Sequence, residues 1–166
     1  MVARKILVLG PLVVLALVLQ TSVVNLLPLP FGRPSLVLLL VVAAALALGS
    51  YDGMVFGFLA GLATDTLSDH PLGLLALVCC VTGYLAGKAA GLDSAMGAVL
   101  IVAFATGAAM LAFAGLLGLL GTGRLGWPVV SRTVPAAAVY NLVLAPFVVP
   151  VVAKLSGWFT RRREMW

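Results

Sequence analysis

The sequence predicts an all-α protein that crosses a membrane as a polytopic helical bundle of about six transmembrane helices. The first observation is a series of long runs without Asp, Glu, Lys or Arg, the longest of which covers residues 94–123. A bilayer core of about 30 Å needs about 20 mostly apolar helical residues. The second is composition: 63% of the residues are hydrophobic and 9% are charged, and the mean hydropathy is +1.23. Soluble domains carry roughly 25% charged residues.

The first span is expected at 6–26, after Arg4 and Lys5. This apolar run is longer than that of a secretory signal peptide, and no small-residue cleavage site follows it, so we expect it to stay in the protein. Pro28, Pro30 and Pro34 then punctuate a short loop that contains Arg33.

The next two elements are expected at 35–48 and 51–66, and both are short. Between Asp52 and Asp65 lie only 12 residues, which cover about 18 Å as a helix. Such a segment cannot cross a bilayer core by itself without bringing its flanking charges close to the two interfaces. We expect two short spans, and the alternative is a single re-entrant hairpin over 35–66.

The remaining spans are expected at 71–87, 95–120 and 135–158, and the whole chain, 1–166, forms one domain. Six spans with both ends in the cytoplasm place more basic residues inside than outside, as cytoplasmic loops require. The inner set is Arg4, Lys5, Lys88, Lys154, Arg161, Arg162 and Arg163, and the outer set is Arg33, Arg124 and Arg132. The net charge of +5 follows from this asymmetry and does not indicate a nucleic-acid partner.

Glycines recur at intervals of four residues in two places. The first row is Gly49, Gly53, Gly57 and Gly61, continued by Asp65; the second is Gly83, Gly87 and Gly91. Residues four apart lie on one face of a helix, and small residues there allow a second helix to approach closely in lipid. Both rows predict helix contacts, either within this chain or with the helix of a partner.

Polar residues at membrane depth are functional candidates, because burying them is costly. They are Asp52, Asp65, Asp69 and Asn141. We interpret Asp65 as a residue that orders a helix end or loop, with a partner contact as the alternative. Asn141 either bonds a neighbouring helix or forms part of a polar pocket wall.

The end of the chain resembles an anchor at the membrane surface. Aromatic rings favour the headgroup level, and basic side chains favour the anionic cytoplasmic leaflet. The residues that carry this prediction are Trp158, Arg161, Arg162, Arg163 and Trp166. A tail that docks a partner is the alternative.

No arrangement in the sequence favours catalysis, a cofactor or a metal. Asp52 and Asp65 resemble the paired carboxylates of intramembrane aspartyl proteases, but the Gly-x-Gly-Asp context is missing. His70 is the single histidine, and Asp65, Asp69 and His70 match no known spacing of metal ligands. Cys79 and Cys80 are adjacent, which argues against a disulfide.

Several segments together resemble the MreD family of rod-shape membrane proteins. They are GFLAGLATD at 57–65, PLGLLAL at 71–77, GYL at 83–85 and YNL at 140–142. The resemblance implies a non-catalytic component of the bacterial inner-membrane elongasome. Its partner would be an MreC-like single-span protein, and through it the chain would support a peptidoglycan polymerase and transpeptidase pair. The family also resembles, in fold, the S components of energy-coupling vitamin transporters.

That second likeness supplies the alternative function, a substrate-binding S component. It would require an outward polar pocket and a first helix with a small-residue surface for docking. The first helix here is instead rich in Val and Leu, with Ala16 as its small residue in the segment 12–18. The sequence also lacks a cluster of Trp, Asn and Arg that would hold a vitamin, so the scaffold is the preferred function.

Overall fold

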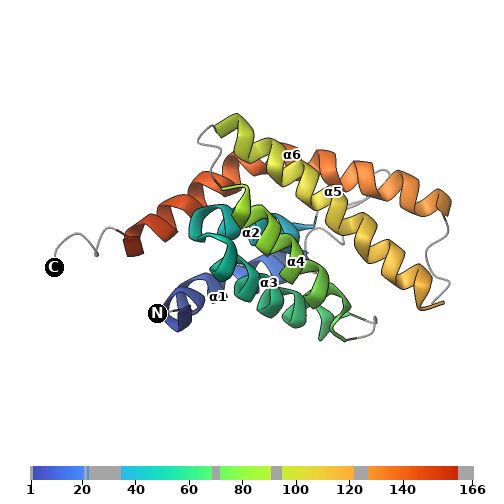
Figure 1. Cartoon of the computed structure of the whole chain (residues 1–166), viewed down its shortest axis with the longest axis horizontal. Helices are drawn as coiled ribbons and strands as arrows, with labels where there is room; N and C mark the ends of the chain where they lie inside the picture. Colours follow the sequence, from blue (N-terminus) through green and yellow to red (C-terminus); the bar gives the residue numbers. More distant parts are fainter. Residues whose placement is uncertain are drawn as a thin grey trace.

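The computed structural model describes residues 2–20, 22, 35–68, 72–90, 95–121 and 127–160. This part of the chain is all-helical, as predicted. Figure 1 shows that successive helices run back and forth along the long axis of the molecule. Their bounds are α1 Val2–Leu19, α2 Leu36–Leu48, α3 Ser50–Asp65, α4 Leu74–Lys88, α5 Ala95–Leu119 and α6 Trp127–Thr160.

Helices α2 to α5 begin and end within a few residues of the predicted spans. Helix α6 differs, because it begins at Trp127 rather than at 135 and continues through Pro135, Pro146 and Pro150. Proline is tolerated in membrane helices where neighbouring groups satisfy the freed carbonyls. The predicted end of the first span, at 26, lies outside the described residues.

Helix α2 is the centre of the bundle. Its nine consecutive residues from Val37 to Ala45 are all buried, and the helix contacts α1, α3, α4, α5 and α6. A helix that is apolar on every side is expected to be buried on every side. With 13 residues it is about 20 Å long. Because protein rather than lipid surrounds it, α2 need not match the thickness of the bilayer.

A single residue, Gly49, joins α2 to α3. Its φ of 93° and ψ of 176° lie in a region that favours glycine, and the chain reverses direction there. An added Cβ on Gly53 would meet Ala45, and one on Gly57 would meet Val41, so α2 and α3 pack as an antiparallel hairpin.

Helices α5 and α6 supply the long apolar segments. Met96–Leu119 and Val130–Leu155 are long and apolar enough to cross a membrane, and only 17% and 22% of an 18-residue window in each are buried in the protein. Phe104 is 80% exposed, Phe147 71% and Leu119 85%. Large apolar side chains exposed along such helices are typical of a surface solvated by lipid rather than water. The apolar helices therefore indicate a membrane protein.

Candidate functional site

The closest helix contact in the described structure is an antiparallel seam between α3 and α4. It is made by Gly53, Gly57 and Gly61 on α3 and by Gly83 and Gly87 on α4. A Cβ on Gly61 would lie 2.5 Å from the Cα of Ala76, and one on Gly87 would lie 2.5 Å from the Cα of Ser50. Real Cβ atoms essentially never come within 3.0 Å of such atoms. Backbone therefore packs on backbone along this α3–α4 seam.

The same holds in the middle of the seam, where the carbonyl groups of one helix face the glycines of the other. A Cβ on Gly57 would lie 2.9 Å from the carbonyl carbon of Cys79, and one on Gly83 would lie 2.8 Å from that of Gly53. Gly49 has a different place, since no atom lies within 4 Å of its added Cβ and its role is the turn. Gly91 lies outside the described residues.

Asp65 ends α3 and holds the beginning of α4. It is 1% exposed, and its carboxylate accepts three backbone hydrogen bonds. Oδ2 accepts from the N–H of Gly73 at 2.9 Å and of Ala76 at 3.1 Å, and Oδ1 accepts from Leu75 at 3.4 Å. Gly73, at the N-cap position of α4, has no side chain to do this. Asp65 therefore caps α4 from another helix and sits at the positive end of its dipole.

Asp52 and Asp65 cannot share a proton in this fold. Asp52 lies in the first turn of α3 and Asp65 is its last residue. Thirteen residues of helix separate them by about 20 Å, whereas a catalytic pair of carboxylates must be in contact. Asp69 and His70 lie outside the described residues.

Asn141 is fully buried and joins α6 to α2. Its Nδ2 donates a hydrogen bond of 3.3 Å to the carbonyl oxygen of Ser35, at the start of α2. Its Oδ1 has no hydrogen-bond partner within the described residues. An unpaired buried amide oxygen is costly, so this atom requires an explanation.

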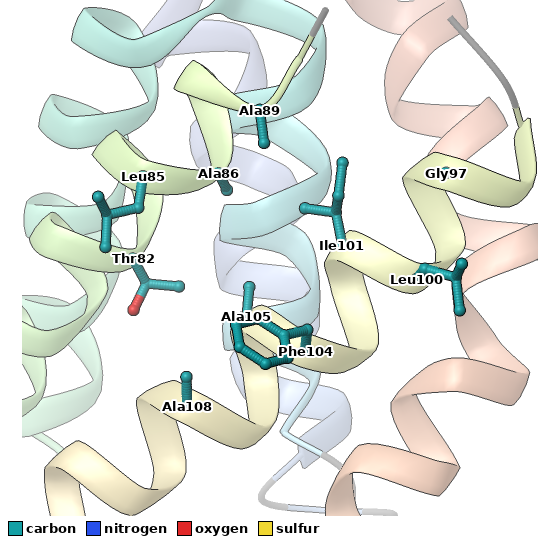
Figure 2. Close-up of a pocket in the computed structure, with 10 residues that line it drawn as sticks. All are labelled: Thr82, Leu85, Ala86, Ala89, Gly97, Leu100, Ile101, Phe104, Ala105 and Ala108. Atoms are coloured by element: carbon teal, nitrogen blue, oxygen red, sulfur yellow. The ribbon is translucent and has the colours of Figure 1, made fainter. Parts of the chain in front are cut away.

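A groove of about 460 Å³ lies between α4 and α5. Figure 2 shows Thr82, Leu85 and Ala86 on α4 and Ala89 at the C-cap of this helix, opposite a row of residues on α5. That row is Gly97, Leu100, Ile101, Phe104, Ala105 and Ala108. Sequence reasoning missed this α4–α5 groove because alanine is common in membrane helices. The repeated small residues at 86, 89, 105 and 108 are the signal that was available.

A second, smaller pocket lies where α2 and α6 begin and α3 ends. It has a volume of about 290 Å³ and is partly open. Its polar lining comes from Gln20, Ser35, Thr64, Ser68 and Thr133, and its apolar lining from Leu38, Leu75, Met110, Phe113 and Ala137. The sequence did not reveal this polar pocket, because its residues come from all parts of the chain.

The residues of the predicted surface anchor lie at the C-terminal end of the chain, most of them beyond the described residues. Arg161, Arg162, Arg163 and Trp166 lie outside the described residues. Trp158 belongs to the last turns of α6, where only the backbone is described. The anchor therefore remains a prediction.

Comparison with known families shows which family the chain belongs to. The family described as rod shape-determining protein MreD matches residues 3–157, which is nearly the whole chain. No curated protein matches the sequence. The match includes all four segments that carried the resemblance, and the apolar helices agree with a membrane protein. The chain therefore belongs to the MreD family of rod shape-determining membrane proteins.

Proposed function

We propose that the chain is a non-catalytic scaffold of the bacterial elongasome. In this role it binds an MreC-like single-span protein inside the membrane and so supports lateral-wall peptidoglycan synthesis by a polymerase and transpeptidase pair. The observation that carries the proposal is the α4–α5 groove, which is apolar and is lined by Ala86, Ala89, Ala105 and Ala108, among others. Small residues at a membrane-helix surface permit close approach of another helix.

The size of the connections supports an interface within the membrane. Specific protein interfaces typically bury about 1,200–2,000 Å² in total. In the described structure, α2 and α3 are joined by one residue, and the segment from α3 to α4 spans 66–73. Such short connections offer little surface outside the helices, so a partner would obtain most of its contact area from helix faces.

The glycines of the α3–α4 seam are not available to a partner helix, because α3 and α4 already pack against each other there. This leaves the groove side of α4 as the small-residue face that is open to a second protein. Two observations support a non-catalytic role. Asp52 is far from Asp65, and three backbone N–H groups donate hydrogen bonds to the Asp65 carboxylate.

We also propose that the chain spans the inner membrane with both termini in the cytoplasm. Helices that alternate in direction would bring Lys88 and Lys154 to the end of the bundle where α1 begins, and Arg132 to the other end. This distribution agrees with the excess of basic residues on cytoplasmic sides. Labelling of single cysteines added at the two ends tests it, and an extracytoplasmic C-terminus would exclude this topology.

The partner is tested by co-purification in mild detergent. Full-length MreC-like protein should remain bound, and a form truncated to its soluble domain should be lost. Ala108→Phe, which fills the groove from an exposed position, should abolish the complex, whereas Val143→Phe, at an exposed position of α6 outside the groove, should not. Equal binding by the soluble domain, or by the Ala108→Phe variant, would rule out the groove as the interface.

The S-component function remains the alternative because the polar pocket provides a recess of the required kind. Transport would also require docking to an ATPase-linked subunit, and the exposed side chains described for α1, over residues 10–19, include Val14, Leu15 and Val18. Uptake of a labelled vitamin that depends on this chain would favour that alternative.

A further inference from the structure

The polar pocket combines hydrogen-bonding groups with apolar walls and has no charge. None of its lining residues in the described part of the chain is ionisable. Its volume of about 290 Å³ is at the lower end of the range of about 300–1,000 Å³ found for small-molecule sites. A water molecule takes about 30 Å³ and needs two to four polar partners, so the largely apolar walls suit an organic molecule better than a cluster of waters.

Two hydroxyl groups of the pocket, that of Thr64 at the end of α3 and that of Ser68 just beyond it, are oriented by carbonyl oxygens of α3. Thr64 Oγ1 donates to the carbonyl oxygen of Ala60, and Ser68 Oγ donates to that of Thr64, both at 2.8 Å. Because the hydroxyl proton is used in each case, the oxygen lone pairs are what these residues can offer to a ligand. Both side chains therefore act as acceptors.

Gln20 supplies a hydrogen-bond donor, in contrast to the two hydroxyl acceptors. Its Oε1 accepts a hydrogen bond of 3.3 Å from the N–H of Val37, so the part of the carboxamide left for the pocket is the Nε2 donor. Donor and acceptors thus face a common space whose other walls include Phe113 and Met110. This arrangement matches a neutral group that can both donate and accept.

Asn141 is linked to the polar pocket through one of the residues that line it. Its Nδ2 is bonded to Ser35, which lines the pocket, and Ala137, one turn earlier on α6, lines it as well. The buried Oδ1 of Asn141 has no partner in the described structure.

We propose that this pocket, formed by Gln20, Ser35, Thr64, Ser68, Phe113 and Ala137, binds a neutral hydroxyl- or amide-bearing group on an apolar body. The group belongs either to a free small molecule or to the headgroup of an uncharged lipid, since both present the same chemistry. Such a ligand goes beyond the scaffold function, because it would stabilise the junction of α2, α3 and α6 without any partner protein.

The test uses the full chain in phosphatidylcholine nanodiscs and measures its thermal unfolding. Benzamide, benzoate and benzamidine have nearly the same size but differ in charge. Benzamide should raise the unfolding temperature more than the two ions, because the pocket offers no counter-charge. A second series contains monooleoylglycerol in the nanodisc. If this lipid stabilises the chain and suppresses the benzamide response, the ligand is a lipid headgroup; stabilisation by benzamide alone identifies a free molecule.

Variants locate the binding. Thr64→Val with Ser68→Ala should weaken benzamide binding about tenfold, which is the loss of roughly 1.4 kcal/mol expected for two modest hydrogen bonds. Ser68→Ala alone should show a smaller loss and serves if the double variant does not fold. Thr106→Val is the matched control, because its buried hydroxyl makes the same bond within its own helix, to Val102, outside the pocket.

Three results would overturn the proposal. One is that neither benzamide nor monooleoylglycerol stabilises the chain, which would mean that the pocket holds water only. Another is that benzamide raises the unfolding temperature of the wild type and of the Ser68→Ala variant equally. The third is stronger stabilisation by benzoate or benzamidine. Each leaves the scaffold function unaffected, since no partner protein is present in the measurement.

Discussion

Helix α4 has two faces rich in small residues, of which one is packed against another helix and the other borders a groove. On one face, Gly83 and Gly87 touch the backbone of α3. On the other, Ala86 and Ala89 border a groove that α5 does not close. Both faces satisfy the small-residue pattern that favours helix association in lipid. The pattern therefore predicts that a close contact is possible, and it does not predict which contact forms.

The difference between the α3–α4 seam and the α4–α5 groove arises from what holds the helices together. Asp65 ties the end of α3 to the first turn of α4 through three hydrogen bonds, and glycine rather than alanine lets the backbones meet. Helix α5 instead packs extensively along α6, and Figure 1 shows these two helices together on one side of the bundle. A face left open in this way is available to a partner.

The seam should be the most sensitive region to added volume. Gly61→Ile should reduce the free energy of unfolding by about 3 kcal/mol, because the new side chain meets the rigid backbone of Ala76. Gly115→Ile on α5, where no atom lies within 4 Å of the added Cβ, should cost less than about 1 kcal/mol. Chemical denaturation in detergent measures both. Equal effects would show that the seam is not tightly packed in the membrane.

Loss of the hydrogen bonds that Asp65 accepts from the start of α4 should have the next largest effect on the free energy of unfolding. Asp65→Ala should cost about 2 kcal/mol, because it leaves backbone N–H groups at the start of α4 unpaired, and Asp65→Asn should cost less, because an oxygen acceptor remains. Hydrogen exchange at Ala76 should accelerate in both. The control is Thr66→Ala, an exposed residue just after α3 whose hydroxyl donates to the carbonyl oxygen of Ala63. Unchanged exchange at Ala76 would contradict the capping role.

Asn141 should matter less than Asp65, although both are buried. Asn141→Leu loses one long hydrogen bond to Ser35 but also removes an unpaired oxygen, so the free energy of unfolding should change by less than about 1 kcal/mol. Thermal unfolding of the chain without added ligand measures it. A loss as large as that of Asp65→Ala would mean that Oδ1 has a strong partner.

The groove should tolerate added volume with almost no change in stability. Ala108→Phe should alter the free energy of unfolding by less than about 0.5 kcal/mol, because the residue is exposed, while it removes partner binding. The sharpest form of the comparison is therefore a pair of measurements, stability and co-purification, on Gly61→Ile and Ala108→Phe. If Ala108→Phe destabilises the chain like Gly61→Ile, the groove is already closed in the membrane.

The sequence by itself determined the helical membrane class and most helix bounds. Charge-free runs have the length of a bilayer core, and Gly and Pro punctuate them, so local composition is sufficient. It also favoured a helix-ordering role for Asp65 over a partner contact, because this charge stands at a helix end next to a turn. Helix α6 begins before the span expected at 135–158, since proline does not have to begin a membrane helix.

Only the tertiary structure decided which faces meet. A glycine row has the same sequence pattern whether it packs on this chain or on another, and the fold places Gly53, Gly57, Gly61, Gly83 and Gly87 between α3 and α4. The open face of α4 and the polar pocket depend on residues such as Gln20, Thr64 and Phe113, which are far apart in sequence. Local pattern identifies an apolar helix but not its neighbours, because in lipid every apolar face is equally well solvated until packing selects one.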